Sequence, residues 1–376
     1  MDNPKISVLI PMYNRKQYAA QCIDSALNQT FQDYEIVIRD DCSTDGVFEF
    51  IQEKYAQQIS EGKIRLLKNK ENIKEFRTVC NLIQDGRGKY FTVLHNDDIL
   101  LPQALQNYYT VADHFKADVV HCSYTLFMLV YIKDGVEHNL QPRLTCWENN
   151  PASNGQIMKV PYESKFRFND WYNNGTFCDF QFNLFNKQFF MEELFQDFVH
   201  LNLDLLNLLW IMKSKIFIKI PLPSHIRRNA PDSASNKKRD VSFIKNFITG
   251  KLHANYIWNT TLSKIEFFRK NPEWIYLAQI RTMARSHFTQ ITTHNFYQDG
   301  ITSELNEAVE NAFKEVFGEN YLYPTILFHF ANLSGISSKV ENSVFNDLLK
   351  NFHERFMLNK SLQDQFSSPP PPSEMA

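Results

Sequence analysis

The stretch "YFTVLHNDDIL", residues 90–100, ends an apolar, strand-like run abruptly in two adjacent carboxylates, Asp97 and Asp98. A parallel strand that is buried on both faces has a nearly continuous apolar sequence. In open α/β sheets, ligands bind in the crevice beyond the carboxyl ends of such strands. The stretch therefore predicts a central parallel strand that delivers two neighbouring negative charges to a ligand site.

Apolar runs and helical patterns alternate around this stretch throughout the first 130 residues. Strand-like runs occur as "KISVLIP" (5–11), "YEIVIRDD" (34–41) and "KIRLLKN" (63–69), and helical patterns such as "RKQYAAQCIDSALNQ" (15–29) separate them. Repeated strand, helix and strand units are joined by right-handed crossovers and form a mainly parallel sheet. We therefore expect an α/β fold with a doubly wound, mainly parallel sheet.

The pattern changes beyond this first part of the chain. Residues 134–176 are polar and rich in turn-forming residues, which predicts a loop or insertion. Core-like apolar patterns return over 177–223, and amphipathic stripes such as "SELNEAVENAFKEVFG" (303–318) predict a C-terminal helical region. The end of the chain, "SSPPPPSEMA" (367–376), is Pro-rich and is expected to be disordered.

The composition is that of a folded protein without the charge of a nucleic-acid binder. Hydrophobic residues make up 43% and charged residues 22% of the chain, which is typical of globular domains. A net charge of -2 argues against nucleic acid as a partner, because such binders need a basic surface. Six cysteines without a C-x-x-C pair indicate free thiols in a reducing compartment. We see no secretory signal, and the most hydrophobic stretch, 119–132, is too short to span a bilayer.

Four polar loops follow the carboxyl ends of the first four predicted strands. Because the carboxyl ends of parallel strands share one edge of a sheet, we expect these loops to converge on one crevice. Together they offer an aromatic face, carboxylates and basic side chains, which suits a nucleotide diphosphate. The loops are "PMYNRKQY" (11–18), "DDCSTDG" (40–46), "KENIKEFR" (70–77) and "HNDD" (95–98).

Individual residues of these loops also have ordinary explanations. Tyr13 could stack on a base or only seal the first turn, and Asp41 could accept hydrogen bonds from a nucleobase or ribose. Asp45 or Ser43 of the same loop could simply cap the following helix. Lys74 and Arg77 could contact phosphate or be solvated charges, so only the convergence of the loops favours a site.

The pair Asp97 and Asp98 is the strongest signal in these loops. Two carboxylates about 4 Å apart repel each other by roughly 4 kcal/mol at an effective dielectric constant of about 20, and a divalent cation would convert this repulsion to attraction. Oxygen ligands favour Mg2+ or Mn2+, whose shells are usually completed by water and substrate phosphates. The alternative is a cap for the helix near Pro102, which explains one carboxylate but not two. We expect both carboxylates to lie in a surface loop.

The quoted motifs occur in an order that resembles the inverting glycosyltransferases of family 2, which have the GT-A fold. The resemblance covers about residues 4–125, weakens over 178–235 and fades beyond. It implies that Pro11, Tyr13 and Asp41 hold the nucleotide. It further implies that a D-x-D-like motif, Asn96, Asp97 and Asp98, holds the donor diphosphate and a divalent cation, Mn2+ or Mg2+.

Inversion needs a general base that takes the proton from the acceptor hydroxyl. The family usually supplies an acidic pair shortly before an apolar helix. The matching stretch "HLNLDLLNLLWIMKSKIFIKIP" retains only Asp204, which we expect just before that helix. The upstream acids Glu192, Glu193 and Asp197 are the alternatives. A later family motif appears here as "HIRRNAP" with Asn229 where His is common, which leaves two phosphate-binding candidates, Arg227 and Arg228.

The resemblance implies a metal-dependent enzyme that moves a sugar from a nucleotide diphosphate sugar, preferably a UDP-sugar, to a glycan or lipid-linked acceptor. The setting it implies is the synthesis of bacterial surface polysaccharide or lipooligosaccharide, in the cytoplasm or at the inner face of the membrane. A sugar-phosphate nucleotidyltransferase is a rival, but it should carry a Gly-rich loop after the first strand. An inactive glycan-binding or scaffold protein is a second rival, because the base motif is degenerate.

These expectations divide the chain into three parts. Residues 1–235 form the GT-A domain, with a nucleotide-binding half over 1–130 and an acceptor half over 131–235. Residues 236–362 form the helical region, which could bind the acceptor, a membrane surface or a second copy in a homo-oligomer. Residues 363–376 form the disordered tail.

Overall fold

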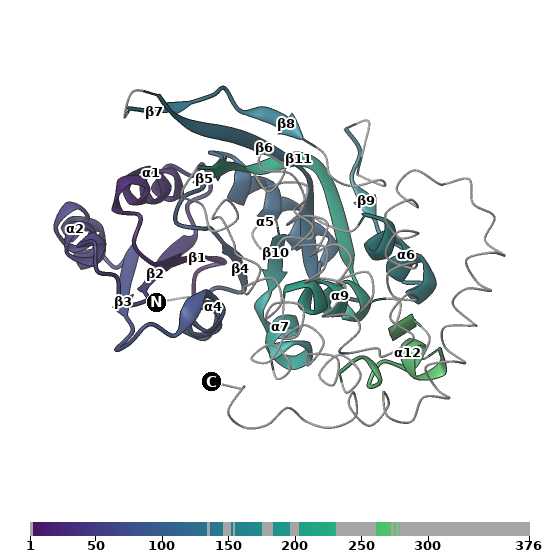
Figure 1. The fold of residues 1–376 in the computed structure, drawn as a ribbon. Helices are drawn as coiled ribbons and strands as arrows, with labels where there is room; N and C mark the ends of the chain where they lie inside the picture. Colours follow the sequence, from purple (N-terminus) through teal and green to yellow (C-terminus); the bar gives the residue numbers. More distant parts are fainter. Residues whose placement is uncertain are drawn as a thin grey trace, which may run out of the picture. The chain divides into compact units, whose positions relative to one another are not determined.

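The computed structural model divides the chain into two compact units, Met1–Pro231 and Asp232–Ala376. It describes residues 3–133, 136–145, 152, 155–174, 183–195, 203–230, 261–271, 274–275 and 278. Figure 1 shows the described helices and strands. Most of the predicted C-terminal helical region and all of the predicted tail lie outside the described residues. In the second unit, a short helix, α12 (Glu266–Lys270), is described.

The first unit is built on one mixed sheet with the strand order β3-β2-β1-β4-β10-β6-β11-β5. Four neighbouring strands run parallel: β1 (Ile6–Met12), β2 (Tyr34–Asp40), β3 (Ile64–Lys68) and β4 (Tyr90–Val93). The strand β10 (Asn183–Asn186) is antiparallel to both β4 and β6 (Val119–Lys133). The strand β11 (Phe217–Asn229) is parallel to β6, and β5 (Ile99–Leu100) is antiparallel to β11. The predicted α/β fold with a mainly parallel sheet is confirmed.

The helices that connect the parallel strands are amphipathic and bury one face on this sheet. In α1 (Lys16–Leu27), the buried residues Ala19, Cys22, Ile23 and Ala26 recur about one turn apart. The same arrangement positions α2 (Val47–Lys54), α4 (Lys74–Asp85) and α5 (Ala104–Phe115), whereas the short helix α3 (Ala56–Ser60) has no buried residue. Each strand end is therefore followed by a loop and a helix, which fixes where the polar loops lie.

Aromatic side chains hold the second half of the sheet to the helices α7 (Lys187–Glu193) and α9 (Leu203–Lys213). The ring of Phe185 in β10 lies 5.4 Å from that of Phe91 in β4 and 5.7 Å from that of Trp210 in α9. Trp210 also packs edge-on against Phe217, at 5.2 Å between ring centroids. Such pairs contribute about 0.5–1.5 kcal/mol beyond the area they bury, and they place α9 under the amino end of β11.

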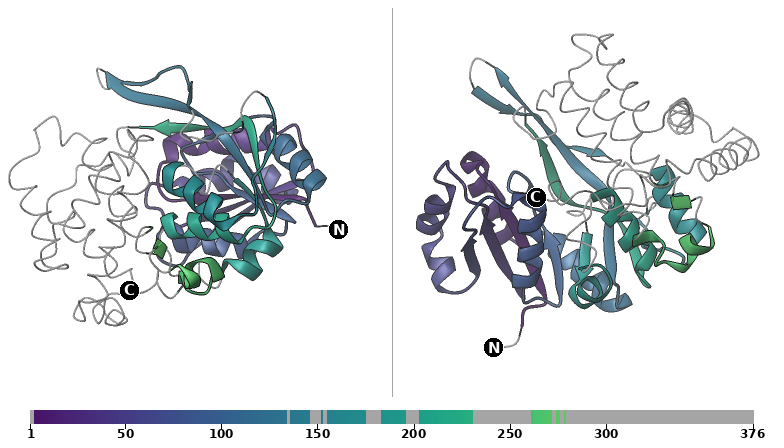
Figure 2. Two further views of the ribbon diagram at one scale, coloured as in Figure 1. Left: turned by 90° about the vertical axis from the view of Figure 1, so that its right-hand side faces the viewer. Right: turned by 60° about the horizontal axis from the view of Figure 1, so that its bottom comes forward.

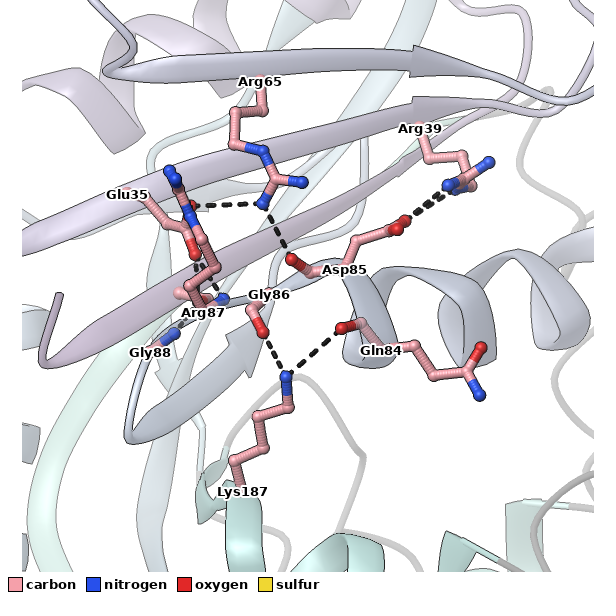
Figure 3. Close-up of polar contacts among 10 residues, drawn as sticks. Glu35, Arg39, Arg65, Gln84, Asp85, Gly86, Arg87, Gly88 and Lys187 are labelled. Atoms are coloured by element: carbon pink, nitrogen blue, oxygen red, sulfur yellow. Dashed lines mark hydrogen bonds and ion pairs between the residues drawn. The ribbon is translucent and has the colours of Figure 1, made fainter. Parts of the chain in front are cut away.

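A charged network ties the amino ends of the strands together (Figure 3). Glu35 of β2 is buried, and its carboxylate accepts hydrogen bonds from Ser7 Oγ (2.8 Å), the Arg87 amide (2.5 Å) and the Arg87 guanidinium (2.9 and 3.0 Å). Arg65 of β3 reaches the same carboxylate at 3.4 Å. A Cβ at Gly88 would lie 2.5 Å from the Ser7 amide nitrogen, so a side chain there would force the strands apart. This network lies at the sheet edge opposite the polar loops.

The prediction of a loop over 134–176 is wrong in part. This region contributes the strands β7 (Val136–Asn139), β8 (Arg143–Thr145) and β9 (Met158–Lys159) and the helix α6 (Ser164–Asn174). Polar and turn residues hid these elements because the strands are short and largely exposed. The buried side chain of Arg167 joins α6 to α9 by donating to the carbonyl oxygens of Pro161 and Ile211, both at 2.8 Å.

The strands β7 and β8 return along β6 and form a long hairpin with it. Figure 2 shows this hairpin extending beyond the rest of the sheet. The hydrophobic stretch 119–132 is thus a strand and not part of a helix. Among the residues that the structure describes, no helix has the length and apolar character needed to cross a bilayer.

Candidate active site at the carboxyl edge of the sheet

The loops after β1 and β2 are locked to each other by hydrogen bonds. The Asn14 amide donates to Ser43 Oγ (2.8 Å), and the Asn14 side chain accepts from the Thr44 amide (3.0 Å). The Lys16 amide donates to the Asp45 carboxylate at 2.8 Å. Asp45 also accepts from the amide of Val47, the first residue of α2, at 3.1 Å, although the cap position of that helix is Gly46. These contacts hold the first two polar loops side by side.

The loop after β4 joins the same cluster. The Asn96 side chain donates to the Tyr13 carbonyl oxygen at 3.3 Å, and Arg15 forms an ion pair with Asp97 at 2.7 Å. Tyr13 keeps 46% of its surface exposed, whereas Pro11 is buried within β1. The structure therefore brings Tyr13, Asn96 and Asp97 together, as the convergence of the loops predicts.

Asp98 differs from its neighbour because it is buried, with 2% of its surface exposed. Its Oδ1 accepts a hydrogen bond from the backbone amide of Arg228 in β11, at 2.8 Å. Burial, together with the negative charge of Asp97, raises the pKa of Asp98 to about 7. The expectation of two surface-loop carboxylates is therefore wrong for Asp98, since β11 covers it.

The helix-cap explanation for this carboxylate is not supported. Helix α5 begins at Ala104 after Gln103, and its cap position makes no side-chain hydrogen bond. Asp98 instead precedes β5, whose Leu100 pairs with His225 of β11. The Asp98 carboxylate thus links the loop after β4 to β11 and does not cap a helix.

Arg228 organises this junction from the side of β11. Its Nε donates to the Asp97 carbonyl oxygen at 2.8 Å, and its guanidinium lies 4.5 Å from the centre of the Tyr18 ring. The guanidinium also donates to the side chains of Gln21 and Asn139. Only 5% of the Arg228 surface is exposed. These contacts assign Arg228 a structural role, which does not fit its prediction as a phosphate partner.

Asp41 lies at the end of β2 and is also buried. Its Oδ1 accepts hydrogen bonds from the Asn69 side chain (2.9 Å) and the Ile73 amide (2.8 Å). Asn69 in turn donates to Thr78 of α4 at 3.0 Å. Asp41 thereby links the loops after β2 and β3 and fixes the start of α4.

The first turn of α4 lies beside the loop after β4, because His95 Nε2 is 3.4 Å from the Glu75 carboxylate. Lys74 and Arg77 belong to this part of the helix and are both exposed. Lys74 has a positive φ of 73°, and its amide donates to the Asn72 side chain at 3.1 Å. The two cations therefore stand at the same edge as the acidic loop, with their side chains toward solvent.

The structure describes the candidate general bases only in part. Asp204 is the second residue of α9, so the expectation that it precedes the helix is wrong by two residues. Its side chain lies outside the described part of the chain, as does Asp197. Glu192 and Glu193 are exposed on α7, where Glu192 accepts from Gln188 (3.0 Å) and Glu193 lies 3.9 Å from Lys213.

Within the described residues, no group of three acidic, histidine or cysteine side chains could hold a metal ion. The polar edge therefore offers the two carboxylates of Asp97 and Asp98 as oxygen ligands. Mg2+ and Mn2+ sites commonly use one or two carboxylates and take their remaining ligands from phosphates and water. Of the two carboxylates, Asp97 is partly exposed, whereas Asp98 is buried and its Oδ1 accepts from the Arg228 amide.

A family model described as "Glycosyl transferase family 2" matches residues 7–194, which is half of the 376-residue chain. The chain belongs to this family. Chondroitin synthase from Escherichia coli is 38% identical over 125 residues, which cover 32% of this chain and 17% of that protein. Glycosyltransferase GlyG from Streptococcus pneumoniae is 32% identical over 120 residues, covering 32% of this chain and 38% of its own length. This family 2 chain therefore matches less than half the length of either relative.

The fold of this family 2 protein is also found among solved structures. TarS residues 1–349 from S. aureus, solved in complex with UDP-GlcNAc, superpose with a TM-score of 0.54. The alignment covers 93% of this chain and 92% of TarS at 13% sequence identity. At that identity the likeness establishes a shared GT-A-type fold and nothing about substrate.

The predicted family membership is thus confirmed. Sequence reasoning missed Arg15 and the structural contacts of Arg228. The "NR" of "PMYNRKQY" was the only local signal for Arg15, and nothing local to "HIRRNAP" indicates that Arg228 reaches the acidic loop.

Proposed function

We propose that this protein is a metal-dependent inverting glycosyltransferase. It moves a sugar from a nucleotide diphosphate sugar, a UDP-sugar, to a hydroxyl of a glycan or lipid-linked acceptor during synthesis of bacterial surface polysaccharide or lipooligosaccharide. The observation that carries the proposal is the convergence of four polar loops on one sheet edge. There Arg15 and Arg228 bind the loop that holds both acidic residues, and Asn96 of that loop donates to the Tyr13 carbonyl oxygen. Membership of family 2 supports the reaction class.

The donor nucleotide would occupy the side of the edge formed by the loops after β1 and β2. Tyr13 presents an exposed ring on which a base can stack. Asp41 offers a carboxylate that is already oriented by Asn69 and the Ile73 amide.

The diphosphate would lie between the acidic loop and the first turn of α4. Asp97 and Asp98 would hold Mn2+ or Mg2+, which neutralises the charge of the leaving diphosphate when it is bound. Lys74 and Arg77 are exposed at the same edge and would contact the phosphate oxygens. Arg15 neutralises the Asp97 carboxylate in this structure and would be freed for phosphate once a cation takes its place.

Transfer requires a base on the acceptor side. Asp204 stands in the first turn of α9 and would take the proton from the acceptor hydroxyl as that oxygen attacks the anomeric carbon. The bond from this carbon to the diphosphate oxygen breaks as the new glycosidic bond forms. Because attack and departure occur on opposite faces, the configuration inverts.

Nucleotide release from a panel of UDP-, GDP- and dTDP-sugars, measured with and without Mn2+, tests the proposal. We expect Mn2+-dependent release from at least one UDP-sugar even without acceptor, through slow transfer to water. Asp41→Asn should weaken donor binding with or without metal. Asp113→Asn is the matched control, because Asp113 is a partly exposed acid on α5 that pairs with Lys116. Release of no nucleotide from any donor would favour a scaffold role instead.

A further inference from the structure

Toward its β7 end, the hairpin formed by β6 with β7 and β8 has one face that packs on the first unit and one exposed face; at β8, Leu144 on the packed side is 60% exposed. Opposite residues of an antiparallel pair lie on the same side, and successive residues alternate between sides. Met128 and Val130 are both 6% exposed, and Val130 packs with Tyr18 of α1 and Ala230. The alternate positions Leu129, Tyr131 and Lys133 of β6 are exposed and lie on the opposite, outer side.

This outer face of the hairpin is apolar. Its members Leu129, Tyr131, Val136 and Leu140 are 44%, 43%, 57% and 44% exposed. The strand register places them together, because Tyr131 is opposite His138, Lys133 is opposite Val136, and the Leu140 amide donates to the Leu129 carbonyl oxygen at 2.9 Å. The hairpin protrudes from the sheet (Figure 2). Single exposed apolar residues are ordinary, but a contiguous group of them on such an element marks an interaction surface.

The charges on the outer face are basic. Lys133 lies opposite Val136, and Arg143 lies opposite Phe127, so both share the side of Leu129 and Tyr131. Both cations are exposed. Among the described residues of this face, no position carries an acid.

This combination favours an anionic lipid surface over a second copy of the chain. A symmetric dimer through this face would bring like charges together without an acid to pair with them. At a membrane, the aliphatic side chains can enter the boundary of the acyl chains, the tyrosine can lie among the headgroups, and the two cations can contact lipid phosphates. We propose that the outer face of the hairpin binds the surface of a membrane rich in anionic phospholipid.

The binding surface is linked to the candidate active site. Asn139 of β7 accepts a hydrogen bond from the guanidinium of Arg228 (3.2 Å), and the Arg228 amide binds Asp98. A docked hairpin would therefore hold the carboxyl edge of the sheet close to the membrane. The inference does not depend on catalysis, and its test measures lipid binding alone.

Vesicle cosedimentation of the full chain tests the inference. We expect the protein to sediment with vesicles containing phosphatidylglycerol and phosphatidylcholine, to bind pure phosphatidylcholine at least about tenfold more weakly, and to be released by salt. Val136→Asp combined with Leu140→Asp should reduce binding by about tenfold or more, because both positions would then repel lipid phosphate. Lys133→Ala with Arg143→Ala should mainly remove the preference for anionic lipid.

Ile157→Asp is the matched control, because Ile157 is 47% exposed but lies beside β9, outside the hairpin. Its vesicle binding should equal that of the wild type, and melting temperatures should show that every variant is folded. Equal sedimentation of the wild type with and without vesicles would overturn the inference. Light scattering that shows a dimer in the wild type and monomers in the hairpin variants would also overturn it. A lower melting temperature in the hairpin variants would do the same, because it would show that this face packs within the chain.

Discussion

Arg228 provides a quantitative test of how the candidate site is built. Replacing it with alanine keeps the backbone amide that binds Asp98 but removes the guanidinium from the Asp97 carbonyl oxygen, Gln21, Asn139 and the Tyr18 ring. If Arg228 were a phosphate ligand, its replacement would mainly lower nucleotide affinity. Loss of a structural guanidinium should lower stability first and nucleotide affinity only indirectly.

The expected loss follows from the surroundings of each contact. A buried hydrogen bond to a charged group contributes about 1.5–3 kcal/mol, which applies to the bond from Nε to the Asp97 carbonyl oxygen. Stacking on Tyr18 adds about 0.5–2 kcal/mol. Gln21 and Asn139 are exposed, so their bonds add little. We therefore expect Arg228→Ala to lower the free energy of unfolding by about 3 kcal/mol, or the melting temperature by roughly 6–12 °C.

Thermal unfolding followed by circular dichroism, together with calorimetric titration of UDP, separates the two roles. Arg227→Ala is the matched control, because Arg227 is the neighbouring residue on the opposite face of β11 and is only partly buried. It should lower the melting temperature much less. An unchanged melting temperature in Arg228→Ala, with UDP affinity reduced about tenfold or more, would refute the structural role and restore Arg228 as a phosphate ligand.

Three further predictions concern other parts of the molecule. Asp204→Asn should lower turnover by about 10² to 10⁴ while donor affinity stays unchanged; near-normal turnover measured by nucleotide release would move the base to Glu193 or Asp197. Burial lowers the pKa of His225 to about 3, so the unfolded chain binds this proton first as the pH falls below about 6.5. As the pH decreases, protonation of His225 in the unfolded chain should lower the free energy of unfolding by about 1.4 kcal/mol per pH unit. Urea titrations at pH 6 and pH 5 should show a smaller decrease in the free energy of unfolding for His225→Gln than for the wild type. Glu35→Ala should lower stability by about 3 kcal/mol or more in chemical denaturation, yet leave UDP affinity unchanged, because the network of Glu35 lies at the opposite edge of the sheet.

The fold and the location of the site could be predicted because their signals are local. Continuous apolar runs ended by polar loops define β1, β2, β3 and β4, and the geometry of parallel strands then brings the loops to one edge. The adjacent acids Asp97 and Asp98 needed no structural information to be noticed. The strand pattern around residue 90 was sufficient to place them at that edge.

The contacts that complete the site join residues distant in sequence, and no local pattern encodes them. Arg15 and Asp97 are 82 positions apart, and Arg228 is 130 positions from Asp98. The burial of Asp98 follows from β11 and could not be inferred from the polar sequence "HNDD". The hairpin was missed for a related reason, since β7 and β8 are held by pairing with β6 rather than by their own composition.

Binding of UDP to wild-type protein and to Asp98→Asn, each titrated with and without Mn2+, tests the central claim most directly. The asparagine can still accept the hydrogen bond from the Arg228 amide, and it removes the repulsion from Asp97, so the melting temperature should not fall. We predict that Mn2+ strengthens UDP binding to the wild type by about tenfold or more and that Asp98→Asn loses this gain. An equal gain from Mn2+ in the folded variant would contradict the assignment of this sheet edge as a cation-assisted diphosphate site.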